Sequence, residues 1–312
     1  MQKTIQDILT EMQKAIVGKQ EVTQTLLTAI LANGHILLDD VPGVGKTTLA
    51  VAVSHVLGLD YKRVQFTPDV LPSDITGYSL YDKQSGGFIY MPGAVTAANI
   101  LLGDEINRTS SKTQSALLEA MEERQVTVDG QTHGLKTPFI VIATQNHIGT
   151  AGTQPLPYAQ LDRFLIRLSI GYPDFESQME MIRDRQTCNP LDTLRQITNH
   201  EQILEMQKQA QSVTVKDSLI AYITKLSTET REHPDITLGI SPRGALCINR
   251  MAKALAFVNG RDYMIPKDVR DIFLCVCEHR ILMNPKAKNG EATAEQALLD
   301  VLEKVVVPEG KI

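Results

Sequence analysis

The sequence predicts an α/β fold built on a parallel β-sheet, followed by a smaller all-helical domain. Over the first 173 residues, short apolar segments typical of buried strands alternate with helical patterns, which is the order that builds a parallel sheet. Helical patterns then dominate, at roughly 174–186, 193–211, 216–232, 242–259, 266–282 and 293–306. We therefore expect an α/β domain at 1–173, a linker at 174–190 and a helical domain at 191–312.

The elements of the α/β domain follow from local patterns. Apolar residues at helical spacing predict a helix at 5–16 and a second helix that ends near residue 31. Residues 67–97 are rich in Pro, Gly and Ser and are expected to form a long loop with insertions, whereas Asp129-Gly130 predicts a β-hairpin turn. Strands are expected at 35–39, 61–66, 100–104, 139–143 and 164–170, and helices at 46–57 and 115–123.

The composition is that of a soluble globular protein. The chain has 312 residues, of which 43% are hydrophobic and 21% charged, and its formal net charge is −5. It can bury a large core, and it offers no overall attraction to nucleic acid or to an anionic membrane. The uncharged segments Val22–Leu38 and Thr137–Leu161 are too polar or too rich in Gly and Pro to span a bilayer, and residues 1–16 lack the apolar run of a signal peptide. We expect a cytoplasmic protein without membrane insertion.

A phosphate-binding loop is predicted at Val41–Thr48 (VPGVGKTT), between a strand and a helix. Glycines let backbone N–H groups converge on an anion, and the helix N-terminus adds the positive end of its dipole. Lys46 is expected to reach the β- and γ-phosphates, and the Thr47 hydroxyl to hold Mg²⁺. The residues expected to bind the nucleotide here are Gly43, Val44, Gly45, Lys46, Thr47 and Thr48. The alternative is a glycine turn with an incidental lysine.

Asp40 departs from the usual G-x-x-x-x-G-K-[ST] pattern, because it stands where the first glycine belongs. A carboxylate at this position would repel the phosphates unless it points away from them. We therefore expect the Asp40 side chain to turn away from the loop.

An apolar strand at 100–104 closes on two adjacent acids, Asp104 and Glu105. Burying a strand that ends in charge is costly unless the charge has a partner. Mg²⁺ with its waters would be that partner for Asp104, and Glu105 would polarise an attacking water. The alternative is a common arrangement of apolar residues before two solvated acids, and the nearby phosphate loop favours the metal interpretation.

The spacing of the four cysteines does not favour a metal site. None of them forms a C-x-x-C pair, and Cys275 and Cys277 point to different faces of a predicted helix. We expect small, reduced core residues. The cysteines are Cys188, Cys247, Cys275 and Cys277.

Three segments resemble signatures of the MoxR-type AAA+ ATPases: Gly103–Thr132, Phe66–Gly77 and Gln160–Phe164. The resemblance extends from about residue 15 to residue 280. It implies an AAA+ P-loop core with a five-stranded sheet whose strands, numbered along the chain, lie in the order 5-1-4-3-2. It also implies ATP and Mg²⁺ as ligands, a homo-oligomeric ring of six subunits, a helix-2 insert near 83–95 and a pre-sensor-1 hairpin near 125–137.

The resemblance also assigns roles to single residues. Asn146 in ATQN matches sensor 1, although a loop Asn that satisfies backbone groups is the alternative. Arg163 in LDRF matches the arginine finger, which reaches the nucleotide of the neighbouring subunit; its alternative is a salt bridge with an acid such as Asp162. Arg243 in SPR matches sensor 2 and follows a good N-cap and a Pro at the first helical position, with a solvated arginine as the alternative.

The remaining carried-over positions are less specific. Val17 and Gly18 match the family's stretch near the adenine. Arg124 and Arg167 are weaker arginine-finger candidates. Phe88 and Tyr90, in the insert, would either grip a substrate in the centre of the ring or be buried.

The core chemistry implied is Mg²⁺-assisted ATP hydrolysis, and no Asn-Lys-x-Asp motif of a GTPase is present. The resemblance implies a chaperone that remodels or matures client protein complexes, often with a partner that carries a von Willebrand factor A domain. A nucleic-acid motor and a nucleotide-dependent switch are the alternatives. The predicted hairpin, QVTVDGQTHGLK, has one lysine and no aromatic residue to stack on bases, so nucleic-acid binding is not favoured.

Overall fold

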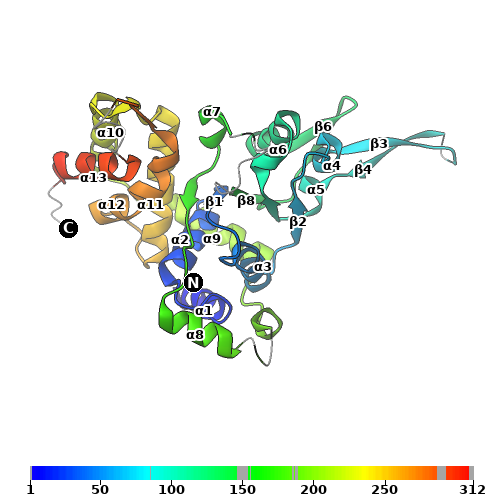
Figure 1. Cartoon of the computed structure of the whole chain (residues 1–312), viewed down its shortest axis with the longest axis horizontal. Coiled ribbons are helices and arrows are strands. Elements are labelled where there is room, and N and C mark those ends of the chain that lie inside the picture. The colour runs from blue at the N-terminus through cyan, green and yellow to red at the C-terminus, as the bar shows by residue number, and fades with distance from the viewer. Residues whose placement is uncertain are drawn as a thin grey trace.

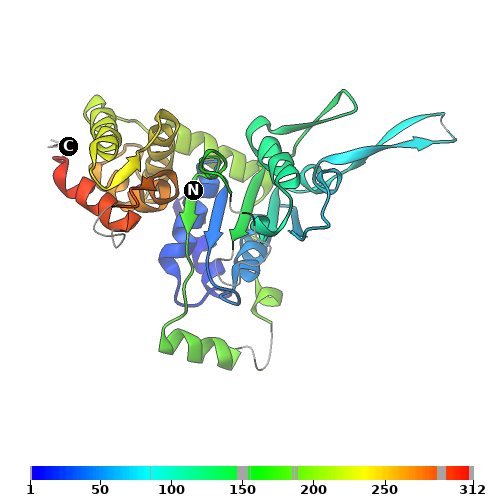
Figure 2. The ribbon, with the colours of Figure 1, turned by 45° about the horizontal axis from the view of Figure 1, so that its top comes forward.

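A five-stranded parallel sheet forms the centre of the computed structural model (Figure 1, Figure 2). The structure describes residues 2–84, 86–145, 154, 156–184, 186, 189–286 and 293–308. All four pairs of neighbouring strands are parallel, and the spatial order confirms the predicted order 5-1-4-3-2. From one edge to the other, the strands are β9 (Ile166–Leu168), β1 (Ile36–Asp39), β8 (Ile140–Gln145), β5 (Ile100–Asp104) and β2 (Tyr61–Gln65).

The two faces of the sheet are covered by different helices, because successive residues of a strand point to opposite sides. Ile36 and Leu38 of β1 belong to the core on one face, whereas Leu37 between them belongs to the core on the other. The first face packs against α1 (Gln2–Gln13), α2 (Gln20–Leu31) and α3 (Lys46–Leu57), and the second against α4 (Pro72–Thr76), α5 (Ala94–Ala97) and α6 (Ser111–Glu123).

The prediction of a long loop at 67–97 is wrong, because this segment folds into α4, α5 and a hairpin between them. The hairpin pairs β3 (Gly77–Asp82) with β4 (Gly87–Pro92) and projects from the body of the molecule (Figure 1). Its residues are mostly exposed, so the strands lack the one-sided apolar pattern that identifies a half-buried strand. The hairpin predicted at Asp129-Gly130 is confirmed at β6 (Gln125–Val128) and β7 (Gln131–Gly134), with positive φ at both turn residues.

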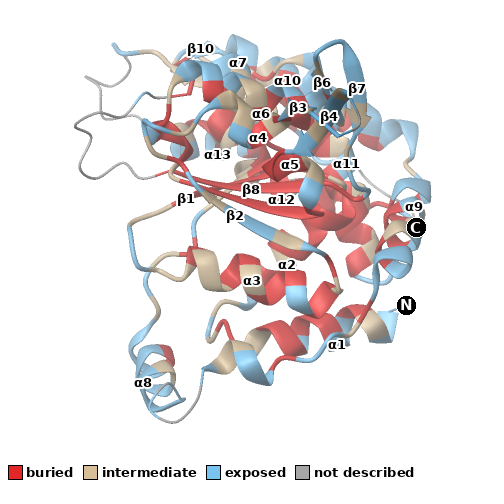
Figure 3. Ribbon diagram, turned by 90° about the vertical axis from the view of Figure 1, so that its right-hand side faces the viewer, coloured by how far each residue is buried: buried red, intermediate tan, exposed pale blue. Residues whose placement is uncertain are grey.

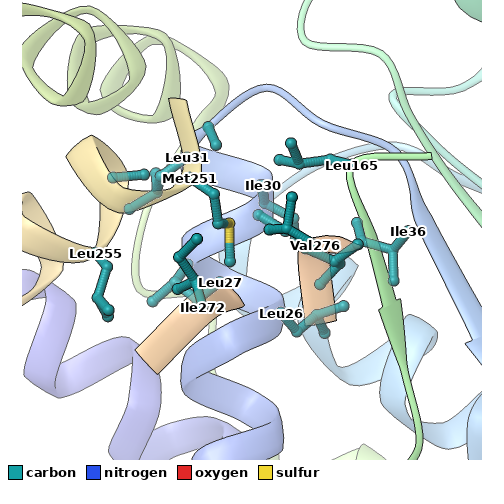
Figure 4. Packing of buried hydrophobic residues seen from close by; sticks show 14 of the residues in the cluster. Leu26, Leu27, Ile30, Leu31, Ile36, Leu165, Met251, Leu255, Ile272 and Val276 are labelled. Carbon is teal, nitrogen blue, oxygen red and sulfur yellow. The ribbon is translucent and has the colours of Figure 1, made fainter. Parts of the chain in front are cut away.

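The C-terminal half is helical and shares a core with the first face of the sheet. Side chains of α2, among them Leu26, Leu27 and Ile30, pack against Met251 and Ile272 of the C-terminal helices (Figure 4). The helices of this half are α8 (Phe175–Asp184), α9 (His200–Ser212), α10 (Asp217–Glu232), α11 (Pro242–Val258), α12 (Pro266–Cys277) and α13 (Ala294–Lys304), with the 3-10 turns η2 (Pro190–Thr193) and η3 (Glu278–Arg280).

Two details differ from the expected division into an α/β domain, a linker and an all-helical domain. A short antiparallel pair joins β10 (Ile236–Leu238) to β11 (Leu282–Met283), and strands of two or three residues are too short to leave a sequence pattern. In addition, α8 lies within the range that was expected to be a linker. The domain boundaries at 173 and 190 stay predictions.

The described cysteines behave as core residues. Cys247 and Cys277 are buried and all three described cysteines are free thiols; burial raises the pKa of Cys275 to about 12. Within the described ranges, no group of His, Cys, Asp and Glu could hold a metal ion, and Cys188 lies outside them. None of the described helices combines the length and the apolar character that a bilayer crossing requires.

Candidate nucleotide-binding site

The phosphate loop lies between the end of β1 and the start of α3, as predicted. Gly43 and Gly45 have φ values of +87° and +98°, a region of backbone space that glycine adopts without strain. A Cβ atom added to either glycine would meet no described atom within 4 Å, so the loop presents bare backbone on that side. Gly45 is the N-cap of α3, which places Lys46, Thr47 and Thr48 in the first helical turn.

Asp40 turns away from this loop and binds the chain that leaves β9. Its Oδ2 atom accepts hydrogen bonds from Ser169 Oγ (3.1 Å), from the backbone N–H of Ile170 and from the backbone N–H of Gly171 (2.9 Å), while Oδ1 accepts from Val41 N (3.1 Å). The expectation that this carboxylate must point away from the loop is met.

Asp104 and Glu105 lie at the carboxyl end of β5, next to the end of β8. The hydroxyl of Thr144 on β8 donates to Asp104 Oδ1 (2.7 Å) and accepts from the backbone N–H of Glu105 (2.8 Å). Glu105 has a φ of +57°, which is uncommon for a residue with a side chain. Thr144 thereby fixes both acids at one point of the sheet edge.

Side chains from the neighbouring strand and turn hold the two carboxylates. Arg63 Nη2 on β2 lies 2.6 Å from Asp104 Oδ2, and Asp104 is largely buried. Glu105 Oε2 accepts from Gln65 Nε2 (3.0 Å) and from Arg108 Nη1 (2.9 Å). In this arrangement neither acid is left without a partner.

Lys46 is the cation at the centre of the edge. Its side chain is buried, and its Nζ atom donates to the backbone carbonyl of Asp40 (2.8 Å). Burial lowers the pKa of Lys46, whereas the nearby carboxylates of Asp40, Asp104, Asp39 and Glu105 act in the opposite direction. These four acids and one lysine give the edge the mixture of charges that a metal-bound polyphosphate needs.

Val17 and Gly18 lie where the chain passes from α1 to α2. They line a surface hollow of about 570 Å³ together with residues of α8, including Glu180 and Asp184. A Cβ atom on Gly18 would lie 2.0 Å from the Oγ atom of Ser177, so only glycine allows the first turn of α8 to pack this closely. Hydrogen bonds from Ser177 lower the pKa of Asp174 in the same turn.

The arginine-finger candidate Arg163 follows α7 (Tyr158–Leu161) and is half-buried. Its predicted alternative, a salt bridge with Asp162, does not form: the Asp162 carboxylate accepts from Arg280 Nε (2.7 Å) and from Ser241 Oγ (3.4 Å). Within the part of the chain that the structure describes, the Arg163 side chain makes no hydrogen bond or ion pair.

Arg243 projects from the first turn of α11, whose N-cap Ser241 accepts from Gly244 N (3.1 Å), as the sequence predicts. Its Nη2 atom lies 2.5 Å from Glu122 Oε2 on α6, and its Nε atom 4.0 Å from Asp162 Oδ2. The structure therefore brings Arg243 to the side of the molecule that carries Arg163, and its partners there are acids of this chain.

The two weaker finger candidates have structural roles. The half-buried Arg124 guanidinium donates to the carbonyls of Phe139 and Asn33, and its removal from solvent lowers its pKa to about 10. Arg167 pairs with the buried carboxylate of Asp39, with 2.5 Å between Nη2 and Oδ2. The sensor-1 candidate Asn146 lies outside the described residues, one position after the end of β8.

The hairpin aromatics divide between the two roles considered for them. Phe88 is 76% exposed and contacts Tyr81 edge to face across β3 and β4. Tyr90 is half-buried: its ring stacks on His133 of β7 at 3.6 Å, and its hydroxyl donates to Thr76 O (2.6 Å). Of Phe88 and Tyr90, Phe88 is therefore the one exposed to another molecule.

Sequence reasoning missed the residues that support the two acids, namely Thr144, Arg63 and Gln65. All three lie on the strands that flank β5: Thr144 is the second-last residue of β8, Gln65 is the last residue of β2, and Arg63 lies two residues before Gln65. A polar residue that ends an otherwise apolar strand was the available signal for Thr144. Arg63 and Gln65 alternate along the edge strand β2, where charged residues are ordinary and carry no such signal.

Family models match two segments of the chain. The model of the ATPase family associated with various cellular activities (AAA) matches residues 35–166, and the AAA lid domain model matches residues 228–300. Chaperone MoxR1 of Mycobacterium tuberculosis is 38% identical over 315 residues, which cover 98% of this chain and 83% of the relative. The chain belongs to the MoxR family of AAA+ ATPases.

Two further matches extend the MoxR assignment over the whole chain. Protein MoxR of Methylorubrum extorquens is 30% identical over 299 residues, which cover 88% of this chain and 86% of the relative. A crystal structure from Cytophaga hutchinsonii superposes with a TM-score of 0.91 at 38% identity and covers 99% of this chain and 96% of its own. The MoxR fold therefore includes both the sheet and the helical C-terminal half.

Proposed function

We propose that this MoxR-family protein hydrolyses ATP in a Mg²⁺-dependent reaction and uses it to remodel or mature client protein complexes. The observation that carries the proposal is the sheet edge where Lys46, Asp104 and Glu105 meet a glycine loop of bare backbone. Backbone N–H groups at a helix N-terminus and a buried lysine suit a polyphosphate. The residues that would bind it are Gly43, Val44, Gly45, Lys46, Thr47 and Thr48.

The residues at this edge fit a magnesium ion. Asp104 and the Thr47 hydroxyl offer hard oxygen ligands, which Mg²⁺ prefers, and the buried Asp104 already requires a positive partner, which Arg63 supplies in this structure. The ion would neutralise charge on the phosphates. Glu105 orients the attacking water, and Asn146 assists it as sensor 1.

Two arginines complete the site from the neighbouring subunit. Arg163 has no intramolecular partner in the described chain, which supports a role for it at another copy's nucleotide. Arg243 lies on the same side and would join it after leaving Glu122. Such arginines stabilise the negative charge that builds up in phosphoryl transfer. This arrangement requires a homo-oligomeric ring, for which we propose six subunits, with Val17 and Gly18 at the adenine of each.

The chaperone role is supported by the name of a relative, Chaperone MoxR1, and by the projecting β3–β4 hairpin with the exposed Phe88. We propose that client proteins, or a von Willebrand factor A-domain partner in the cytoplasm, meet the ring at this hairpin. A nucleic-acid motor is less well supported, because the lysine of the β6–β7 segment, Lys136, pairs with Asp60 (2.5 Å).

The proposal is tested by replacing the residue that orients the water. Glu105→Gln should lower ATP turnover by about 100-fold or more, because general-base positioning contributes about 10²–10⁴-fold, while ATP binding is retained. Glu119→Gln, an exposed glutamate on α6, is the matched control and should leave turnover unchanged. Unchanged turnover in Glu105→Gln would contradict the assignment, and turnover stimulated by DNA or RNA would favour the nucleic-acid motor.

A further inference from the structure

The carboxylate of Asp40 collects donors that would otherwise lack partners. Beyond Leu168 the edge strand β9 ends, and the next backbone N–H groups, those of Ile170 and Gly171, leave the sheet ladder. Both donate to Asp40 Oδ2, as does the Ser169 hydroxyl. Backbone N–H groups rarely remain unpaired in proteins. The glycine that usually occupies position 40 of this motif has no side chain to accept these bonds.

The segment held by Asp40 leads directly into α8. The carbonyl of Tyr172 accepts from Lys19 Nζ (2.8 Å), and two residues later the turn Asp174–Ser177 packs on Gly18. Residues 169–172 therefore connect the phosphate loop to Val17 and Gly18, on the side proposed for the adenine.

Little of α8 is buried against the rest of the molecule. Only Ser177 among its ten residues is buried, and Figure 3 shows the helix set apart from the main body and largely exposed. Isolated helices of this length are marginally stable in water. The attachments at its N-terminal end, through Asp40, Lys19 and Gly18, therefore help to fix its position.

We propose that Asp40 is a positioning residue that holds the adenine side of the nucleotide site in place from the phosphate side. The inference rests on the proposed function, since it concerns how the same site grips ATP. The backbone carbonyl of Asp40 binds Lys46 while its carboxylate binds the entry to α8, so one residue connects the two ends of the site.

The proposal makes opposite predictions for ATP and for a ligand without a base. Asp40→Ala removes a negative charge beside the phosphates, so inorganic tripolyphosphate should bind as tightly as to the wild type or more tightly. ATP should bind about tenfold more weakly, because the hydrogen bonds lost to a charged acceptor outweigh the relief of repulsion. Asp40→Asn keeps an acceptor oxygen, and its affinity for ATP should stay within about threefold of the wild type.

The experiment measures the affinity of the full chain for ATP and for tripolyphosphate by titration calorimetry. The control is Asp60→Asn, which also removes one negative charge but lies before the amino-terminal end of β2, away from the carboxyl edge of the sheet. Amide hydrogen exchange is measured in the nucleotide-free proteins. We expect Ile170 and Gly171 to exchange faster in Asp40→Ala than in the wild type and in Asp40→Asn. Equal changes in affinity for the two ligands, or unchanged exchange at these amides, would overturn the proposal.

The outcomes separate this proposal from the proposed function. A wild type that binds neither ligand would contradict ATP binding by this chain, and the exchange rates of Ile170 and Gly171 would still decide whether Asp40 anchors the entry to α8. A wild type that binds ATP, combined with an unaltered ATP affinity in Asp40→Ala, would leave the proposed function standing and reject the role of Asp40.

Discussion

Predicted site residues meet at the carboxyl edge of the sheet but not at the junction between α7 and α11. We use this name for the region where Arg163 follows α7 and Arg243 lies in the first turn of α11. At the sheet edge, Lys46, Asp104 and Glu105 converge, and Thr144 ties the two acids to each other. At the junction, Arg243 pairs with Glu122, and Arg163 makes no ion pair with any described residue. The residues of the first site meet within one chain, whereas the second is the site for which we propose completion by another copy.

The difference teaches how far a single chain can specify a site. Parallel strands that end at the same edge bring their last residues together by geometry alone. No such constraint acts on an arginine that follows a four-residue helix or begins a helix of the other half of the chain. Its functional partner, if it lies in a neighbouring subunit, has no trace in the contacts of one copy.

The largest effect on ATP turnover is expected for a substitution at Arg163. If turnover did not fall, the contrast between the sheet edge and the junction would lose its functional meaning. Arg163→Ala should lower ATP turnover by about 10³-fold, the lower end of what an arginine finger contributes, with little change in the free energy of unfolding because no described partner is lost. Steady-state ATPase assays and urea unfolding check both statements. Lys225→Ala, an exposed cation on α10, is the control.

Mixing variants tests whether Arg163 acts on a neighbour. A ring that combines Arg163→Ala and Glu105→Gln subunits contains intact sites wherever an Arg163→Ala subunit receives its arginine from a Glu105→Gln subunit. We expect the mixture to recover part of the turnover that each variant lacks by itself. No recovery at any mixing ratio would show that Arg163 does not complete another copy's site.

The second effect concerns the stability of the junction. Arg280 is buried and donates from Nε to Asp162 (2.7 Å) and from Nη1 to the Leu165 carbonyl (3.0 Å). Asp162→Ala leaves that guanidinium without its carboxylate and should lower the free energy of unfolding by about 3 kcal/mol, as for other broken buried pairs. Urea denaturation measures this loss.

A contrasting pair in the same half provides the control. Lys267 and Asp271 form an exposed (i, i+4) pair on α12, so Asp271→Ala should cost less than about 0.5 kcal/mol. Equal losses of unfolding free energy in Asp162→Ala and Asp271→Ala would mean that the Asp162–Arg280 pair does not hold α7 to the helical half. The pair would then contribute no more to stability than an exposed ion pair.

The sheet and its neighbours were predictable because their signals are local. Apolar runs located β1, β5, β8 and β9, the glycine loop located the phosphate site, and Asp129-Gly130 located one hairpin. The β3–β4 hairpin was missed because exposed strands carry no one-sided pattern, and Thr144, Arg63 and Gln65 because their importance depends on which strands are adjacent. The partner of Asp40 lies about 130 residues away, so only the folded chain reveals it.

A smaller effect separates the sheet domain from the helical half by pH, since His35 just before β1 and His279 in η3 are both buried. Val141 N donates to His35 Nδ1 (3.0 Å), which requires an unprotonated nitrogen, and burial lowers the pKa of His35 and of His279 well below the usual value. The unfolded chain takes up these protons near pH 6.5 while the folded chain does not. Stability should therefore fall as the pH drops below about 6.5, by about 1.4 kcal/mol per histidine between pH 7.5 and 5.5.

Urea unfolding at several pH values checks this dependence, and single variants assign it. His35→Gln should remove the part that belongs to the sheet, and His279→Gln the part that belongs to the helical half, each about half of the total. An unaltered pH dependence in either variant would show that the corresponding histidine does not contribute.

The smallest effect is expected for the pair that holds Arg243 on its own chain. Arg243 and Glu122 are 45% and 40% exposed, so Glu122→Gln should change the free energy of unfolding by less than about 1 kcal/mol. If Arg243 serves a neighbouring nucleotide, its release should leave ATP turnover undiminished, whereas Arg243→Ala should reduce it. Parallel losses of turnover in both variants would instead make the Glu122–Arg243 pair itself the functional unit, and the junction would then be completed within one chain, as the sheet edge is.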